Sequence, residues 1–314
     1  MNLKGLKDGV FKARNEKNAL PRYVARRYLF GFLERFGLHV VGDHFYEPIP
    51  NLRELKAVYD SSVHDIPGHD FSLDRFALSH AARLEKYGTE FADAAARFGY
   101  DDTNYYFRGA DALSWYCLLR ETKPDSVVEV GQGSSTRVAL AALEKNAAET
   151  AQMAKLLSID PYTRLLGNEL NPERVQFEQW HEPVQRVDVG ELVARCNGNA
   201  ILFVDSSHVH KAGSDVEHLM RHVYPRLPLG CLLHIHDIVL PHPWPLEFYT
   251  EQKWFWNEQD MLEAWLAYNE TFEVLLPVFA LHRDSETVRE AMARVAPSMP
   301  RRDEGYSFYL RKVR

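Results

Sequence analysis

Cysteine is scarce in this sequence of 314 residues. Its three cysteines, Cys117, Cys196 and Cys231, are far apart and form no Cys-x-x-Cys pair. Disulfide frameworks and structural zinc sites are both built from recurring, closely spaced cysteines. We therefore expect neither, and the reducing cytoplasm is the compartment that this cysteine usage favours.

The sequence also lacks an excess of positive charge and any long apolar run. Its 37 lysines and arginines face 44 aspartates and glutamates, which gives a formal net charge of −7. Nucleic-acid-binding proteins usually carry a basic surface, so we expect no nucleic-acid partner. A membrane-spanning helix needs a run of about 18 apolar residues, and we predict none. The N-terminal lysines interrupt any apolar core that a secretory signal would need.

The sequence does contain two regions with different residue patterns. Residues 1–110 show helical spacing and many aromatic residues, and we interpret them as a mainly helical cap over the substrate. Residues 111–314 alternate between apolar and helical segments, which indicates an α/β fold with a mostly parallel sheet covered on both faces. Strands are predicted over 126–130, 155–160, 184–189, 200–205, 230–240, 271–282 and 305–313. The last strand alternates in polarity, as a strand at the edge of a sheet does.

A glycine-rich turn, "EVGQGSST", follows the first predicted strand. Gly131 and Gly133 permit a tight turn that lets a ligand approach the backbone, and the next residues supply capping hydroxyls for a helix. The pattern is not Gly-x-Gly-x-x-Gly, because Thr136 occupies the third glycine position. Asp160 ends the following strand, where a carboxylate can bind the hydroxyls of a ribose. We therefore predict a nucleoside site here.

Four stretches together resemble the class I S-adenosylmethionine-dependent methyltransferases: "VVEVGQGSSTRVA", "LLSIDPY", "ILFVDSSHV" and "LLHIHDIVLP". The closest likeness is to bacterial small-molecule methyltransferases that have a histidine after the aspartate of the fourth strand. The resemblance covers residues 104 to 313 and implies a Rossmann-like sheet with a terminal reversed strand. It also implies S-adenosylmethionine as cofactor. The residues that it assigns to the cofactor are Glu129, Gly131, Gly133, Ser134, Ser135, Asp160, Asp188 and Asp205. Among them, Asp188 would reach the adenine amine.

The later strands carry acids and imidazoles where the second half of a site is expected. Parallel sheets bind ligands beyond the carboxyl ends of their strands, which is where Asp205, His236 and Asp237 lie. In one interpretation these three residues hold a divalent metal, as in metal-dependent O-methyltransferases. The imidazole would favour Mn²⁺, Fe²⁺ or Zn²⁺ over Mg²⁺. In the other interpretation no metal binds, and His208 or His236 acts as general base while Asp237 fixes the tautomer.

An aromatic-rich segment at 241–268, between the core strands, is predicted to cover the substrate. From it we single out Trp244 as a wall of the pocket and Glu258 as a polar contact. In the N-terminal half, Tyr46, Asn104 and Asp111 are predicted to face the same cleft.

The function predicted from the sequence is transfer of a methyl group to a small molecule in specialised or sugar-linked metabolism, with oxygen as the favoured acceptor. A carbon acceptor, such as a prenyl diphosphate or an enolisable substrate, is the alternative within the class. The alternatives from other classes are an NAD-type oxidoreductase, a hydrolase or oxygenase built on a metal site, and a non-catalytic S-adenosylmethionine-binding protein. The sequence leaves open whether the protein forms a homo-oligomer.

Overall fold

The computed structural model describes residues 28–41, 43, 47–162, 170–298 and 304–314. The chain forms two compact units, of which the first comprises Met1–Ser61 and Pro245–Phe255 and the second Ser62–Trp244 and Trp256–Arg314. The sequence instead predicted a division at residue 110 between a substrate-covering region and a cofactor-binding core. The substrate-covering role of residues 1–110 stays a prediction. No helix among the described residues is both long and apolar enough to cross a membrane.

The first unit contains short helices. They are α3 (Phe30–Leu33), η2 (Glu34–Phe36), α4 (Leu52–Val58) and η8 (Phe248–Gln252). Asn51 begins α4, because its side-chain oxygen accepts hydrogen bonds from the backbone N–H groups of Arg53 and Glu54. Asn51 also donates to Asp43 at 2.7 Å.

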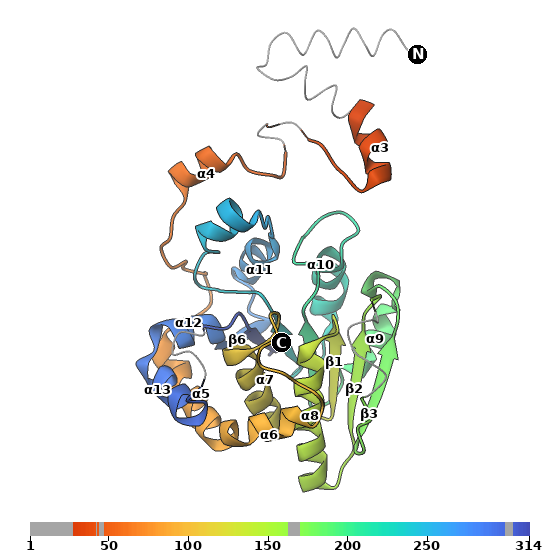
Figure 1. The fold of residues 1–314 in the computed structure, drawn as a ribbon, viewed down its shortest axis with the longest axis vertical. Coiled ribbons are helices and arrows are strands. Elements are labelled where there is room, and N and C mark those ends of the chain that lie inside the picture. The colour runs from red at the N-terminus through yellow and green to blue at the C-terminus, as the bar shows by residue number, and fades with distance from the viewer. Residues whose placement is uncertain (1–27, 42, 44–46, 163–169, 299–303) are drawn as a thin grey trace. The chain divides into compact units, whose positions relative to one another are not determined.

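The second unit is built on a sheet of seven strands in the order β3-β2-β1-β4-β5-β7-β6 (Figure 1). The strands are β1 (Ser126–Val130), β2 (Ala154–Ile159), β3 (Val175–Trp180), β4 (Ala200–Val204), β5 (Leu232–Ile235), β6 (Phe272–Pro277) and β7 (Phe308–Lys312). The first five pair in parallel, and β7 runs antiparallel to both β5 and β6. The chain order therefore reverses between β1 and β4, where sheets of this kind bind ligands.

Two groups of helices accompany the sheet. The first group is α5 (Leu73–Tyr87), η3 (Gly88–Glu90), α6 (Phe91–Ala96), α7 (Gly109–Thr122), α8 (Ser134–Thr150), α12 (Val278–Asp284) and α13 (Glu286–Val295). The second is η5 (Val184–Arg186), α9 (Val189–Arg195), α10 (Asp215–His218), η6 (Leu219–Val223) and η7 (Tyr224–Arg226). Helix α11 (Glu258–Leu266) precedes β6. The crossover from β1 through α8 to β2 and the crossover from β3 through α9 to β4 run in opposite directions along the sheet. Because both are right-handed, α8 and α9 lie on opposite faces of the sheet.

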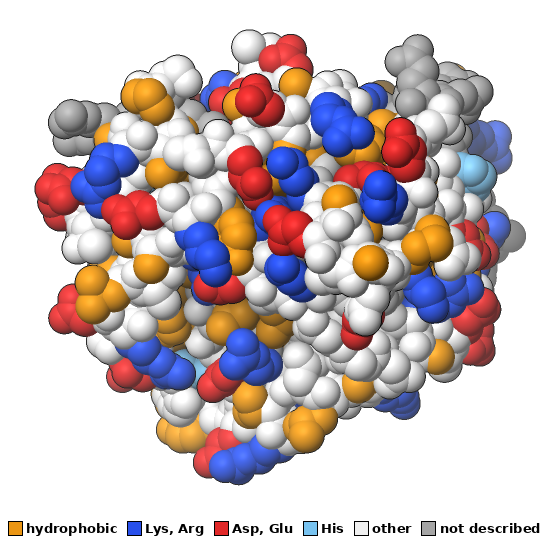
Figure 2. Space-filling view, turned by 90° about the horizontal axis from the view of Figure 1, so that it is seen from below, with side chains coloured by type: hydrophobic (Ala, Val, Ile, Leu, Met, Phe, Trp, Pro, Cys, Tyr) orange, Lys and Arg blue, Asp and Glu red, His pale blue; other side chains and the backbone are white. Residues whose placement is uncertain are grey.

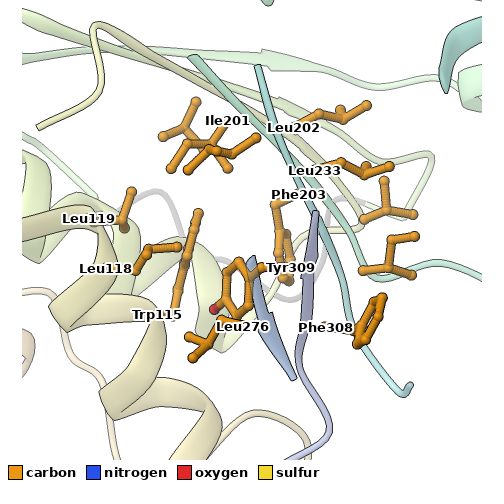
Figure 3. Packing of buried hydrophobic residues seen from close by; sticks show 14 of the residues in the cluster. Trp115, Leu118, Leu119, Ile201, Leu202, Phe203, Leu233, Leu276, Phe308 and Tyr309 are labelled. Carbon is orange, nitrogen blue, oxygen red and sulfur yellow. The ribbon is translucent and has the colours of Figure 1, made fainter. Parts of the chain in front are cut away.

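The core lies between α7 and the central strands. All five residues of β4 are buried, as a strand covered on both faces requires. Trp115 of α7 is fully buried and stacks on Phe203 of β4 with ring centroids 5.5 Å apart, beside Tyr309 of β7 (Figure 3). This packing anchors the strands whose carboxyl ends carry the site. On the face of the molecule in Figure 2, basic and acidic side chains are interspersed.

Three expectations for the sheet were wrong. The strand predicted at 271–282 ends at Pro277, and residues 278–282 belong to α12. The predicted strand at 184–189 is the turn η5 followed by the start of α9, and the third strand is β3 at Val175–Trp180. That strand lies at the edge of the sheet, and its exposed polar residues hide its pattern. The last strand is not an edge strand, because β7 lies between β5 and β6 and is almost wholly buried.

Gly131 lets the turn after β1 touch the turn after β4. Its φ is +92°, and a Cβ atom there would lie 1.8 Å from the carbonyl oxygen of Asp205. The backbone N–H of Asp205 in turn donates to the carbonyl of Val130 at 2.9 Å. Only glycine fits both the conformation and the space.

We expect Gly131→Ala to lower the free energy of unfolding by about 3 kcal/mol, because it combines backbone strain with a steric clash. Gly133→Ala is the matched control, since Gly133 has an extended φ of 178° and open space where its Cβ would lie. It should cost less than about 1 kcal/mol. Chemical denaturation measures both, and equal losses would contradict the assigned role of Gly131.

Candidate active site

The glycine turn and Asp160 form one hydrogen-bonded unit. The backbone N–H of Gln132 donates to Oδ2 of Asp160 at 2.8 Å, and the N–H of Tyr162 donates to Oδ1 at 2.5 Å. Each carboxylate oxygen can accept more than one hydrogen bond, so capacity for two ribose hydroxyls remains. The structure therefore brings Asp160 to the turn, as the sequence predicts, with its carboxylate already oriented.

Glu129 lies under the turn and is almost fully buried. Its carboxylate accepts hydrogen bonds from the hydroxyls of Ser135, Thr136 and Ser158 at 2.7, 2.5 and 3.0 Å. Burial raises the pKa of Glu129 to about 7, although these three donors act to lower it. The residue thus ties the first turn of α8 to β2, a role that the sequence did not reveal. Ser134, at the start of α8, is half-buried.

Asp188 lies farther along the same edge of the sheet. It is the N-cap of α9 and accepts a hydrogen bond from the N–H of Glu191 at 2.9 Å. Together with Trp180 and Arg186 it lines a hollow of about 340 Å³ beyond β3. The assignment of Asp188 to an adenine amine stays a prediction.

Three potential metal ligands meet beyond β4 and β5. Of the described residues, Asp205, His208 and Asp237 offer ligand atoms that all lie within 4.8 Å of one another. Nε2 of His208 is 3.3 Å from Oδ1 of Asp205 and 3.2 Å from Oδ2 of Asp237. His208 and Asp237 both have a φ of +56°, a strained conformation for non-glycine residues that is concentrated at functional sites. The predicted metal set had His236 in place of His208.

Glu258 and Trp256 enclose His208 from the α11 side. Oε2 of Glu258 lies 3.1 Å from Nδ1 of His208, and the Trp256 ring lies 4.7 Å from the imidazole, measured between centroids. Glu258, predicted as a contact to substrate, therefore contacts His208 directly. The sequence singled out the aromatic segment but not Trp256, since the pattern does not distinguish one of its rings from another.

His236 is held from the opposite side by α7. Its Nε2 lies 3.3 Å from Oδ2 of Asp111, and its Nδ1 lies 3.6 Å from Asp205 and 3.7 Å from Asp237. Asp111 is itself buried and accepts the N–H of Tyr306 at 2.8 Å. Asp111, predicted to contact substrate, thus belongs to the same cluster.

This cluster holds four carboxylates around two imidazoles, a surplus of two negative charges when every group is ionised. Burial alone would lower the pKa of His208, but Asp205, Glu258 and Asp237 raise it to about 10. Burial likewise opposes the charge of His236, whose pKa Asp237, Asp205 and Asp111 nevertheless raise. Burial raises the pKa of Asp237 and of Glu258. Such a site attracts cations.

The remaining predicted substrate residues differ in their surroundings. The side-chain amide of Asn104 makes hydrogen bonds to the backbone of its own loop. Its nitrogen donates to the carbonyls of Asp101 and Phe107, and its oxygen accepts from the N–H groups of Tyr106 and Phe107. Trp244 is buried and its ring lies 5.8 Å from that of Trp256. Tyr46 lies outside the described residues.

The buried carboxyl of Glu129 predicts a measurable pH dependence of stability. Its folded pKa lies above the usual 4.5, so its penalty is absent below pH 4.5 and grows as the pH rises toward 7. Glu129→Gln removes this titration. We expect the stability difference, variant minus wild type, to rise by about 2 kcal/mol between about pH 5 and pH 8.

Glu149→Gln is the control, because Arg120 and Lys123 lower the pKa of Glu149 to about 2 and its titration lies below this range. Its difference from wild type should stay level from about pH 5 to pH 8. Unfolding curves at several pH values supply the measurement, and a level difference for Glu129→Gln as well would refute the assignment.

Comparison with known proteins gives one family match. A family model described as a methyltransferase domain matches residues 128–238, which begin on β1 and end just after Asp237. The glycine turn, Asp160 and the metal-ligand group all lie inside this range. A search among curated proteins found no match.

Similar solved structures include a methyltransferase from Podospora anserina bound to S-adenosylhomocysteine. It has 15% identity over 88% of this chain and 100% of its own, with a TM-score of 0.40. An O-methyltransferase from Bacillus cereus with S-adenosylhomocysteine has 9% identity over 77% and 100%, with a TM-score of 0.31. A structure described as CmcI with Mg and S-adenosylmethionine has 17% identity over 84% and 96%, with a TM-score of 0.36. At these TM-scores the likeness carries no weight for the site.

The family match and the strand order are independent of those structures. The matched range contains the turn and the strand ends at which the sheet order reverses. They show that residues 128–238 match a methyltransferase domain and that the sheet has the mostly parallel, Rossmann-like order of the class I methyltransferase fold.

Proposed function

We propose that the protein transfers a methyl group from S-adenosylmethionine to an oxygen of a small molecule, aided by a divalent cation at Asp205, His208 and Asp237. The observation that carries this proposal is the meeting of two half-sites across the β1–β4 switch point. Gly131 of the nucleoside half is in backbone contact with Asp205 of the cation half.

The donor side of the site suits a nucleoside without a pyrophosphate. Asp160 would bind the ribose hydroxyls, and the backbone of Gly131 and Gly133 would leave room for the methionine part. No third glycine is needed, because the anion-binding helix start that serves dinucleotides has no phosphate to bind here. Glu129, which is buried beneath the turn, would hold the turn in place through its hydrogen bonds to Ser135, Thr136 and Ser158.

The donor set fits a divalent cation. Two carboxylates and one imidazole nitrogen converge, and a bound cation would compensate the surplus negative charge of the cluster. The imidazole favours Mn²⁺, Fe²⁺ or Zn²⁺ over Mg²⁺, which prefers oxygen ligands. When bound, such an ion supplies Lewis acidity toward a coordinated acceptor hydroxyl.

The chain's own residues then align the reactants and move a proton. In-line displacement at a sulfonium depends on alignment and exclusion of water. The rings of Trp256 and Trp244 beside the cluster would exclude water and attract the cationic donor. We assign His236 as proton acceptor once a bound cation offsets the charge of Asp205 and Asp237, which otherwise favour the protonated ring. Its Nδ1 lies 3.6 Å from Asp205, and its Nε2 lies 3.3 Å from Asp111. In the alternative without metal, His208 would be the base and Asp237 would orient it. The neighbouring carboxylates argue against this alternative, because they raise the pKa of His208 to about 10 and so keep it protonated at neutral pH.

Other acceptors and classes can be separated by experiment. A carbon acceptor in a diphosphate or enolisable substrate uses the same half-sites, and product analysis distinguishes it. The methyltransferase-domain match argues against an NAD-type oxidoreductase. A non-catalytic S-adenosylmethionine-binding protein would transfer no label from methyl-labelled S-adenosylmethionine to any compound in an extract of source cells, whereas we expect labelled small molecules.

We expect Asp160→Asn to weaken S-adenosylhomocysteine binding by about tenfold, since a charged hydrogen-bond acceptor for the ribose is lost. Asp101→Asn is matched to it, because Asp101 also accepts the backbone N–H of the residue two positions on, Thr103. That control should bind as the wild type does. Isothermal titration calorimetry measures both, and unchanged binding by Asp160→Asn would exclude it from the ribose site.

We expect Asp237→Asn to weaken Mn²⁺ binding by at least about tenfold, because the site loses an anionic ligand, while S-adenosylhomocysteine binding persists. Asp284→Asn serves as control, since Asp284 pairs with His242 at 2.7 Å instead of joining the cluster. Free Mn²⁺ is counted by electron paramagnetic resonance. Wild-type protein that binds the nucleoside but no Mn²⁺ would remove the metal from the proposal and leave the cofactor in place.

A further inference from the structure

We propose that Glu258 is a positioning residue, which holds Nδ1–H of His208 so that Nε2 is presented to the cation. The inference rests on the proposed cation site. It assigns to the segment before β6 a function in metal binding, where the sequence suggested contact with substrate.

The two nitrogens of His208 face different partners. Nδ1 lies 3.1 Å from Oε2 of Glu258, whereas Nε2 lies 3.3 and 3.2 Å from Asp205 and Asp237. Because carboxylates face both nitrogens, both can carry a proton until a cation between Asp205 and Asp237 takes the place of the proton on Nε2. The carboxylate of Glu258 would then keep the remaining proton on Nδ1 and leave the lone pair of Nε2 to the cation. Ligating histidines commonly donate their other N–H to a carboxylate, which orients the ring and makes it a stronger ligand.

Helix α11 is bound to the same loop through its backbone. The N–H groups of Asn257 and Glu258 donate to the carbonyl of His208 at 3.1 and 3.2 Å. The Asn257 side chain also bonds to both the N–H and the carbonyl of His210, at 2.7 and 3.2 Å. The carboxylate of Glu258 is therefore fixed relative to the imidazole that it contacts.

Packing alone does not account for a glutamate at this position. Glu258 is 2% exposed, its Oε2 contacts His208, and its Oε1 has no hydrogen-bond partner. The adjacent Gln259 is equally buried, but its amide oxygen accepts the N–H of Val239 and its amide nitrogen donates to the carbonyl of His242. Burying a carboxylate with an unsatisfied oxygen is costly, and such groups are retained where their charge has a function.

The test compares Glu258→Gln with wild type in Mn²⁺ binding. We expect the dissociation constant for Mn²⁺ to rise about 10- to 100-fold, the usual effect of losing the outer partner of a ligating histidine. Affinity for S-adenosylhomocysteine should stay within about twofold, because Glu258 is not placed at the nucleoside half. A thermal melt of each variant establishes that it is folded.

Glu263→Gln is the matched control. Glu263 lies on the same helix and also bonds to an imidazole Nδ1, that of His64 at 2.7 Å, but it is outside the cluster. It should bind Mn²⁺ as the wild type does. If folded Glu258→Gln binds Mn²⁺ as tightly as wild type, the inference is overturned and the proposed function stands. If wild type binds no Mn²⁺ at all, the cation site and the inference fall together.

A measurement on the wild type guards against variants that do not fold. In protein labelled with ¹⁵N at histidine and loaded with Zn²⁺, the ring nitrogens of His208 report which one carries the proton. We expect a protonated Nδ1 and a metal-bound Nε2, with Glu258→Ala as the sample in which this tautomer is no longer fixed. A metal-bound Nδ1 in the wild type would overturn the inference.

Discussion

The backbone contact between Gly131 and Asp205 is the constraint on which the rest of the site depends. It lies where the strand order reverses, and it brings the turn after β1 against the turn after β4. One turn carries the geometry for a nucleoside, and the other carries the first of the acids that form the cluster. A side chain at position 131 would separate them, so a single glycine determines whether the two halves form one site.

The cation half of the site, beyond β4 and β5, is defined by its buried charges. Four carboxylates and two imidazoles are packed at the ends of β4 and β5, between α7 and α11. Buried carboxylates at this density do not stabilise a fold by themselves, because removing them from water costs more free energy than their attraction to the two imidazoles returns. They create instead a strong preference for positive charge, which both a divalent ion and the sulfonium donor supply.

The sequence predicted the parts of this account that depend on strand ends. Asp160, Asp205 and Asp237 could be placed because each follows a short apolar strand, and the carboxyl ends of parallel strands share one edge. It could not predict which imidazole joins the ligand group, because the orientations of His208 and His236 depend on Glu258 and Asp111, which are distant in sequence. Strand β3 was misplaced for a related reason: an exposed edge strand has little apolar pattern.

The most direct test of the central claim is anomalous diffraction from crystals grown with S-adenosylhomocysteine and Mn²⁺. The account predicts a manganese peak bounded by Asp205, Nε2 of His208 and Asp237, with the nucleoside across the glycine turn and its sulfur directed toward the metal. A nucleoside bound elsewhere, or a cluster without manganese while the nucleoside lies on the turn, would contradict it.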